Sequence, residues 1–144
     1  KEAKIFKDGR EKENDRNLCV TVRDELEKYS ILAGYYTLGF DVKFLNARLL
    51  KWGERPLSRK LHIDLYRVVV KHFPNTYSRS LAVITQFLGI KGKTKLDFEV
   101  WVRAALGGDK KALEIIAEHC RQDLLITEKL LDKFKDRIVS ISLA

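Results

Sequence analysis

Apolar residues recur at helical spacing in four parts of the chain. Leu18, Val22 and Leu26 are four apart among polar neighbours, as in a surface helix with one apolar stripe. Gly53 and Gly89 each follow the end of such a stripe, and glycine is typical of the residue after a helix. The predicted helices cover residues 18–29, 42–52, 80–88 and 110–135.

Three short segments have the pattern of strands. Residues 31–36 form an almost uncharged run, which is typical of a strand covered on both faces. Residues 61–70 contain a second apolar segment around Asp64, and residues 3–7 alternate small or apolar side chains with charged ones. Short strands that alternate with helices predict an α/β architecture, in which helices pack on the faces of a sheet.

The predicted sheet is small for an independent fold. The 144 residues, of which 45% are hydrophobic, are enough for one core, so we expect a single domain over residues 1–144. A sheet of about three strands with an open edge is poorly stable and prone to association. We therefore expect further strands before residue 1, in the natural protein or in another chain, and regard the domain as N-terminally incomplete.

Charge and composition narrow the class of protein. Lysine and arginine number 28 against 20 aspartate and glutamate, an excess expected of a protein that meets phosphates, although cationic surfaces also serve solubility and membranes. Cys19 and Cys120 are too few for a disulfide framework and too isolated for a zinc ribbon. No apolar run approaches the ~20 residues of a membrane span. These features predict a cytoplasmic protein without a membrane partner.

Asp41 is the first candidate for chemistry. It follows the strand-like run and a glycine-containing turn, so it is expected at the start of a helix and at the carboxyl end of a strand, where α/β proteins place their ligands. Aspartate is also a preferred helix-capping residue. A structural role as an N-cap is therefore the alternative for Asp41.

His119 and Asp123 form the second candidate. They are four residues apart on the long predicted helix, so their side chains project from the same face, beside the apolar stripe. The alternative is a solvated pair with no chemical role. Two carboxylates far apart in sequence can hold metal ions that activate water against a phosphodiester, and an adjacent histidine can orient or deprotonate that water. A two-metal site, however, normally needs more than two carboxylates.

Several segments together resemble the DEDD (DnaQ-like) superfamily of 3′→5′ exonucleases, which have a ribonuclease H-like fold. The run from Gly34 through Phe40-Asp41 to Leu45 is similar to the second exonuclease motif, and Asp123 preceded by His119 is similar to the third. Residues 62–66 and 80–94 resemble the segments between them. The likeness covers residues 30–135 and is greatest to stand-alone exonucleases related to the editing domain of family B DNA polymerases.

The resemblance implies a site and its cofactor. Asp41 and Asp123 would be ligands of Mg²⁺ or Mn²⁺, with two ions in the complete site. His119 occupies the position where one subclass carries tyrosine, whereas the histidine-bearing subclass usually places its histidine one residue farther away. The first motif of the family, Asp-x-Glu on the first strand, is absent before Asp41 in a strand context. The fold implied is thus a ribonuclease H-like mixed sheet flanked by helices that lacks its first strands.

Other residues are candidates for contact with nucleic acid. Tyr36 stands where many members of the family have asparagine, and Phe40 follows it in the same motif, although its apolar ring also suits the core. Aromatic side chains stack on bases of single strands, and cations neutralise phosphates. For Asp64, a structural hydrogen bond is favoured over metal contact. The cationic candidates are Arg48, Lys91 and Lys93.

The sequence predicts a metal-dependent 3′→5′ exonuclease that hydrolyses phosphodiesters by a two-metal-ion mechanism. Its substrate would be single-stranded or 3′-end nucleic acid, with DNA favoured. Two alternatives stay open. One is a catalytically inactive nucleic-acid-binding module of the same fold, and the other is a protein-interaction domain whose basic face meets an acidic partner.

Overall fold

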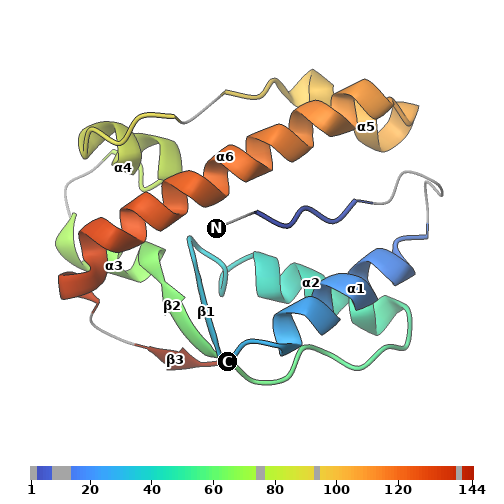
Figure 1. Cartoon of the computed structure of the whole chain (residues 1–144), viewed down its shortest axis with the longest axis horizontal. Helices are drawn as coiled ribbons and strands as arrows, with labels where there is room; N and C mark the ends of the chain where they lie inside the picture. The colour runs from blue at the N-terminus through green and yellow to red at the C-terminus, as the bar shows by residue number, and fades with distance from the viewer. Residues whose placement is uncertain (1–2, 8–13, 74–76, 93–94, 139–140) are drawn as a thin grey trace.

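A computed structural model describes residues 3–7, 14–73, 77–92, 95–138 and 141–144. Helices and short strands alternate in its first half, and helices dominate the second (Figure 1). The elements, in chain order, are α1 (Arg16–Glu27), β1 (Ile31–Gly34), α2 (Asp41–Lys51), β2 (Leu61–Asp64), α3 (Leu65–His72), α4 (Leu81–Phe87), α5 (Phe98–Gly107), α6 (Lys110–Phe134), the 3-10 helix η1 (Lys135–Arg137) and β3 (Ser142–Leu143).

The sheet has the strand order β1-β2-β3 and is mixed. β1 and β2 are parallel, with Gly34 opposite Asp64, and β3 pairs antiparallel with the first two residues of β2. The carboxyl ends of β1 and β2 therefore lie at one edge of the sheet, where the chain continues into residues 35–40 and α3. The predicted α/β architecture, a small sheet flanked by helices, is confirmed.

The third strand is not where the sequence placed it. Residues 3–7 form no strand but run between α1 and α6 (Figure 1). Lys4 pairs with Glu25 of α1 at 2.5 Å, and Lys7 pairs with Glu114 of α6. The prediction of a strand at residues 3–7 was wrong. Alternation of apolar and charged residues indicates only that one face of a segment is buried, and here the charged side chains form ion pairs with two helices.

The main core joins α3, α4 and the second half of α6. Its buried members are Leu65, Val68, Val69, Ile84, Ile90, Ile126, Leu130 and Phe134. Tyr35, the residue after β1, packs against this cluster, as does Ile63 of β2. Asp123 lies three residues, about one helical turn, before Ile126. Packing therefore ties the part of α6 that carries Asp123 to the carboxyl end of the sheet.

The outer edge of β1 is open. Within the described residues β1 pairs only with β2, and Ile31 is 50% exposed. A cavity of about 570 Å³ lies beside this edge, lined mainly by apolar side chains of α1, β1 and α2. The prediction that residues 31–36 are covered on both faces was wrong, since Ile31 and Ala33, which share one face of β1, are both exposed. An apolar space borders an unpaired strand instead.

Candidate active site

A buried carboxylate holds the turn that precedes Asp41. Asp64, the last residue of β2, is 6% exposed. Its Oδ1 accepts hydrogen bonds from the amides of Tyr36 at 2.7 Å and Tyr66 at 3.1 Å, and its Oδ2 accepts one from the amide of Leu38 at 3.1 Å. Three donors compensate the burial of the charge. The predicted structural role of Asp64 is thus confirmed, and it joins the residue 36–38 turn to the start of α3.

Asp41 is the first residue of α2, whereas Phe40 occupies the N-cap position. The predicted start of a helix is confirmed, but Asp41 is one residue past the cap. Desolvation by surrounding protein atoms raises the pKa of Asp41, although the residue retains solvent contact, and the charge of Asp64 raises that pKa further. Its position at a helix N-terminus acts in the opposite direction, because the positive end of the helix dipole favours the ionised carboxylate. Asp41 is a carboxylate with access to solvent at the carboxyl edge of the parallel strands.

His119 and Asp123 share one face of α6, as predicted. Nε2 of His119 lies 3.6 Å from Oδ2 of Asp123. The side chains are only 15% and 30% exposed, so the alternative of a fully solvated pair is wrong. This part of the face lies between the buried residues Ala117 and Ile126. The pair is therefore half-buried beside the core rather than on the outer surface of the helix.

The described residues do not form a complete metal site. No group of three or more His, Cys, Asp or Glu side chains that could hold a metal ion occurs in the part of the chain that the structure describes. Hard divalent ions such as Mg²⁺ require more oxygen ligands than two carboxylates supply. The donor set present therefore does not fit a two-metal centre by itself.

A family model described as RNase_H superfamily, named RNase_H_2, matches residues 1–135. The chain belongs to the RNase H superfamily. Comparison with curated proteins gave no match, and comparison with solved structures gave none either. For this RNase H superfamily domain, membership supports a nuclease function in general and a nucleic-acid substrate. The mixed sheet flanked by helices fits an RNase H-like fold that lacks some of its strands.

None of the helices described in this RNase H superfamily domain is long and apolar enough to cross a membrane.

Arg48, one of the predicted cations, pairs with a carboxylate other than Asp41. Arg48 donates to the Asp15 carboxylate from Nε at 2.7 Å and from Nη2 at 2.6 Å, and Trp52 donates to the same carboxylate at 2.7 Å. The hydrogen bond from Arg48 holds the pKa of Asp15 well below its usual range. This geometry favours a structural role for Arg48, which fastens the start of α1 to α2.

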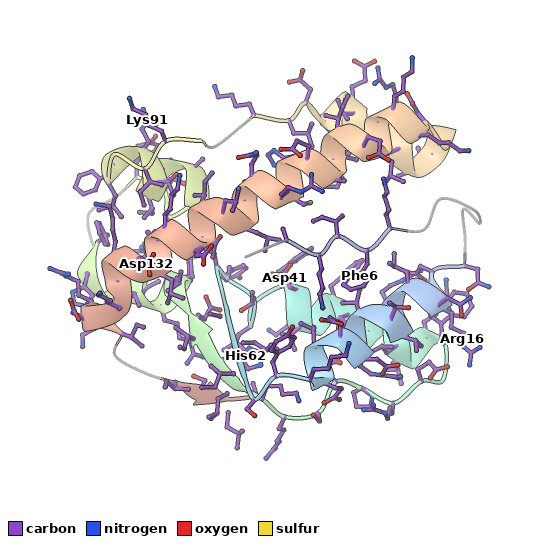
Figure 2. The ribbon with its side chains drawn as sticks, in the orientation of Figure 1. Phe6, Arg16, Asp41, His62, Lys91 and Asp132 are labelled. Atoms are coloured by element: carbon purple, nitrogen blue, oxygen red, sulfur yellow. The ribbon has the colours of Figure 1, made fainter. Side chains whose placement is uncertain are left out.

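Two further cations and an aromatic residue were predicted to contact nucleic acid. Lys91 is exposed after α4 and, in the view of Figure 2, lies on the opposite side of α6 from Asp41. Lys93 lies outside the described residues. Phe40 is 59% exposed and stacks on Phe44, with 5.7 Å between ring centroids, so its assignment to the core was wrong. Both phenylalanines line the cavity beside β1.

His62 is a buried polar residue that the sequence analysis did not single out. It lies on β2, is 1% exposed and lines the cavity beside β1 (Figure 2). Neither ring nitrogen has a hydrogen-bond partner among the described residues. Burial lowers the pKa of His62, against the smaller opposing effect of the Asp64 charge. A histidine inside an apolar strand, two residues before a buried aspartate, was the available signal.

Lowering the pH should destabilise the domain through His62. The unfolded chain binds a proton at His62 near the ordinary pKa of about 6.5, whereas the folded protein binds it only at lower pH. The stability that depends on neutral His62 is thus complete above about pH 6.5. Below that pH the free energy of unfolding decreases by at most about 1.4 kcal/mol per pH unit. Urea unfolding at pH 7, 6 and 5 measures this slope in the wild type and in His62→Leu.

The comparison isolates one residue, because His72 and His119 are present in both proteins. The slope of the wild type should exceed that of His62→Leu between pH 7 and 5. Equal slopes in the two proteins would show that His62 does not couple protonation to folding.

Proposed function

We propose that this domain is a metal-dependent 3′→5′ exonuclease in which Asp41 and Asp123 are metal ligands. The observation that carries the proposal is the Asp64 clamp, the set of hydrogen bonds from the amides of Tyr36 and Leu38 to the Asp64 carboxylate. It fixes the turn before Asp41 at the carboxyl edge of two parallel strands. Ligands of α/β proteins bind at such edges. The superfamily match and the resemblance of residues 34–45 to an exonuclease motif support the same assignment.

The remaining carboxylates are proposed to come from an extended segment that pairs with the open edge of β1. That edge borders an apolar cavity of about 570 Å³, and Asp41 contributes to the cavity wall. A strand added there would have one face toward α1 and α2 and its main chain beside β1. Its acidic side chains would then lie near Asp41, and the ligand set that Asp41 and Asp123 leave incomplete would be filled.

His119 is proposed to position the attacking water. Its Nε2 lies 3.6 Å from the Asp123 carboxylate, which is close enough to orient the imidazole when it carries a proton. A histidine imidazole placed beside a water molecule can act as a general base toward it. The preferred ions are Mg²⁺ or Mn²⁺, because the proposed ligands are carboxylate oxygens. The substrate is proposed to be a single-stranded or 3′-end nucleic acid, with DNA favoured.

One observation favours a second candidate function. The described residues contain no group of three metal-binding side chains. A domain that keeps the fold but not the metal site would bind nucleic acid without cleaving it. The net charge of +8 is compatible with that role as well, since phosphate contacts alone supply sequence-independent affinity. The alternative is therefore a catalytically inactive nucleic-acid-binding module.

The experiment that tests the proposal uses single-stranded DNA labelled at its 5′ end, incubated with the full chain and Mn²⁺ or Mg²⁺. We expect a ladder of products shortened from the 3′ end, which stops on addition of EDTA and is prevented by a blocked 3′ terminus. Binding of the same oligonucleotide without shortening would support the inactive module instead. Internal cleavage of a 3′-blocked substrate would contradict the exonuclease, and neither binding nor cleavage would contradict both candidates.

A further inference from the structure

Tyr36 and Tyr66 form an aromatic pair at the carboxyl edge of the sheet. Their ring centroids are 4.8 Å apart with an interplanar angle of 64°, and Tyr35 contacts the Tyr66 ring from 5.9 Å, edge to face. Tyr36 is 48% exposed, so much of its surface remains available to a ligand. Tyr66 follows the buried Asp64 by two residues, and Tyr36 donates its amide to the same carboxylate. One carboxylate therefore sets the position of both rings.

The backbone of Tyr36 is in an unusual conformation. Its φ of 61° lies in the left-handed region, which aromatic residues rarely occupy. The carbonyl of Tyr36 accepts hydrogen bonds from the amides of Gly39 and Phe40, both at 3.0 Å, and the Tyr36 N–H donates a hydrogen bond to the Asp64 carboxylate. A Cβ at Gly39 would lie 2.4 Å from the Tyr36 ring. The turn therefore holds the ring over a glycine at the expense of backbone strain, a combination found at functional positions.

The pair separates two surface pockets, and each pocket has a cationic side chain in its wall. The first, of about 400 Å³, includes Tyr36, Tyr66 and Arg79. The second, of about 380 Å³, includes the same two tyrosines together with Lys43 and Arg67. Asp64 also lines the second pocket, but three backbone amides already donate to its two oxygens. Aromatic surface thus lies between cations on both sides.

We propose that Tyr36 and Tyr66 form a stacking platform for a base of a single-stranded nucleic acid, whose flanking phosphates are held by Arg79 on one side and by Lys43 and Arg67 on the other. Stacking on aromatic side chains combined with backbone contacts to cations is the general mode of single-strand binding. A base paired within a duplex has no free face for such a platform. The assignment rests on the proposed function and names the form of substrate, a single strand with intact bases, that the site accepts.

The test compares two oligonucleotides of equal length and charge, poly-deoxythymidine and the same strand made of abasic residues. Fluorescence anisotropy with labelled strands is measured in EDTA, so that binding is separated from cleavage. Loss of one stacked base lowers affinity by about 5- to 150-fold, so the wild type should prefer the base-containing strand by such a factor. Tyr36→Leu should remove most of the preference, whereas Tyr36→Phe should retain it.

A matched control and two charge variants complete the design. Tyr77→Leu replaces a tyrosine that is 90% exposed and lines neither pocket, so it should leave the preference unchanged. Lys43→Gln and Arg67→Gln should weaken the binding of both strands equally and reduce its salt dependence, since each removes a phosphate contact. Arg67→Gln also removes the hydrogen bond from Arg67 to the hydroxyl of Ser142 in β3, so its free energy of unfolding is measured alongside. These two variants leave the turn intact and keep the proposal testable if Tyr36→Leu does not fold.

The outcomes separate the platform from the function on which it rests. Equal affinity of the wild type for the thymidine and abasic strands would overturn the platform and leave nucleic-acid binding in place. A preference that survives Tyr36→Leu, or that Tyr77→Leu removes equally, would also overturn it. Absence of binding to either strand would instead overturn the proposed function.

Discussion

Replacement of Asp64 by alanine is expected to lower the free energy of unfolding by about 2–5 kcal/mol. Three backbone amides, those of Tyr36, Leu38 and Tyr66, lose a charged acceptor. A buried donor left without an acceptor costs about 1–3 kcal/mol, and water that enters the turn relieves part of the sum. Asp64→Asn keeps one acceptor oxygen and should cost less. Urea unfolding followed by the fluorescence of the two tryptophans measures both changes.

Asp97→Ala is the matched control for this prediction. Asp97 stands at the N-cap of α5, but its side chain forms no capping hydrogen bond. Its replacement should change the free energy of unfolding by less than about 0.5 kcal/mol, as for most surface positions. If Asp64→Ala were as mild as Asp97→Ala, the Asp64 clamp would not determine the stability of the turn.

Asp41→Asn and Asp123→Asn should each reduce the rate of 3′-end shortening at least about 100-fold, because even residues that only support a metal ligand cost about 10- to 100-fold when removed. Both replacements preserve side-chain volume, and neither aspartate belongs to the buried core. The free energy of unfolding and the affinity for single strands in EDTA should therefore change little. Single-turnover assays with 5′-labelled DNA and saturating protein give the rate without the contribution of product release.

Asp132→Asn provides the control for these variants. Asp132 is exposed on the same helix as Asp123, near its C-terminal end and away from Asp41 in the view of Figure 2. Its replacement removes one negative charge from the domain without touching the site, so the rate should equal that of the wild type. Shortening that persists in Asp41→Asn and Asp123→Asn would falsify their role as metal ligands and return both residues to structural roles.

The sequence predicted four helices correctly because each has an amphipathic stripe that reports its buried face. It missed α5 (Phe98–Gly107) and α3, which begins at Leu65 immediately after β2. The run Val68-Val69-Val70 is β-branched and reads as strand, since such side chains are restricted in helices. The signal that a helix begins was Asp64 itself, whose carboxylate caps α3 through the Tyr66 amide. It was hidden because the strand and the helix meet without an intervening turn.

β3 could not be predicted from local pattern. It contains two residues and pairs with β2 about 80 positions earlier, so its existence depends on tertiary contacts rather than on its own sequence. The conformation of residues 3–7 also depends on tertiary contacts, because their charged side chains pair with residues of α1 and α6. Alternation of apolar and charged residues does not distinguish an edge strand from an extended segment that lies between two helices.

Part of the candidate site was accessible to sequence reasoning. The position of Asp41 at the start of a helix after a strand follows from a local pattern, and so does the shared face of His119 and Asp123. The conformation of Tyr36 was not accessible, because its left-handed φ is held by Asp64, 28 residues later in the chain. Tyr66 could not be singled out from the sequence either, because its proposed role depends on the contact of its ring with Tyr36.

The open edge of β1 also bears on the behaviour of the protein at high concentration. Among the described residues no strand pairs with this edge, so its main-chain donors and acceptors are open to another chain, and Ile31 adds an exposed apolar side chain. Only four residues make up the strand, and the net charge of +8 keeps two molecules apart at low ionic strength. Salt shortens the range of that repulsion, from about 30 Å at 0.01 M to about 8 Å at 0.15 M. Colloidal stability of this domain therefore depends on its positive charge, and concentrated stocks keep best in buffers of low ionic strength.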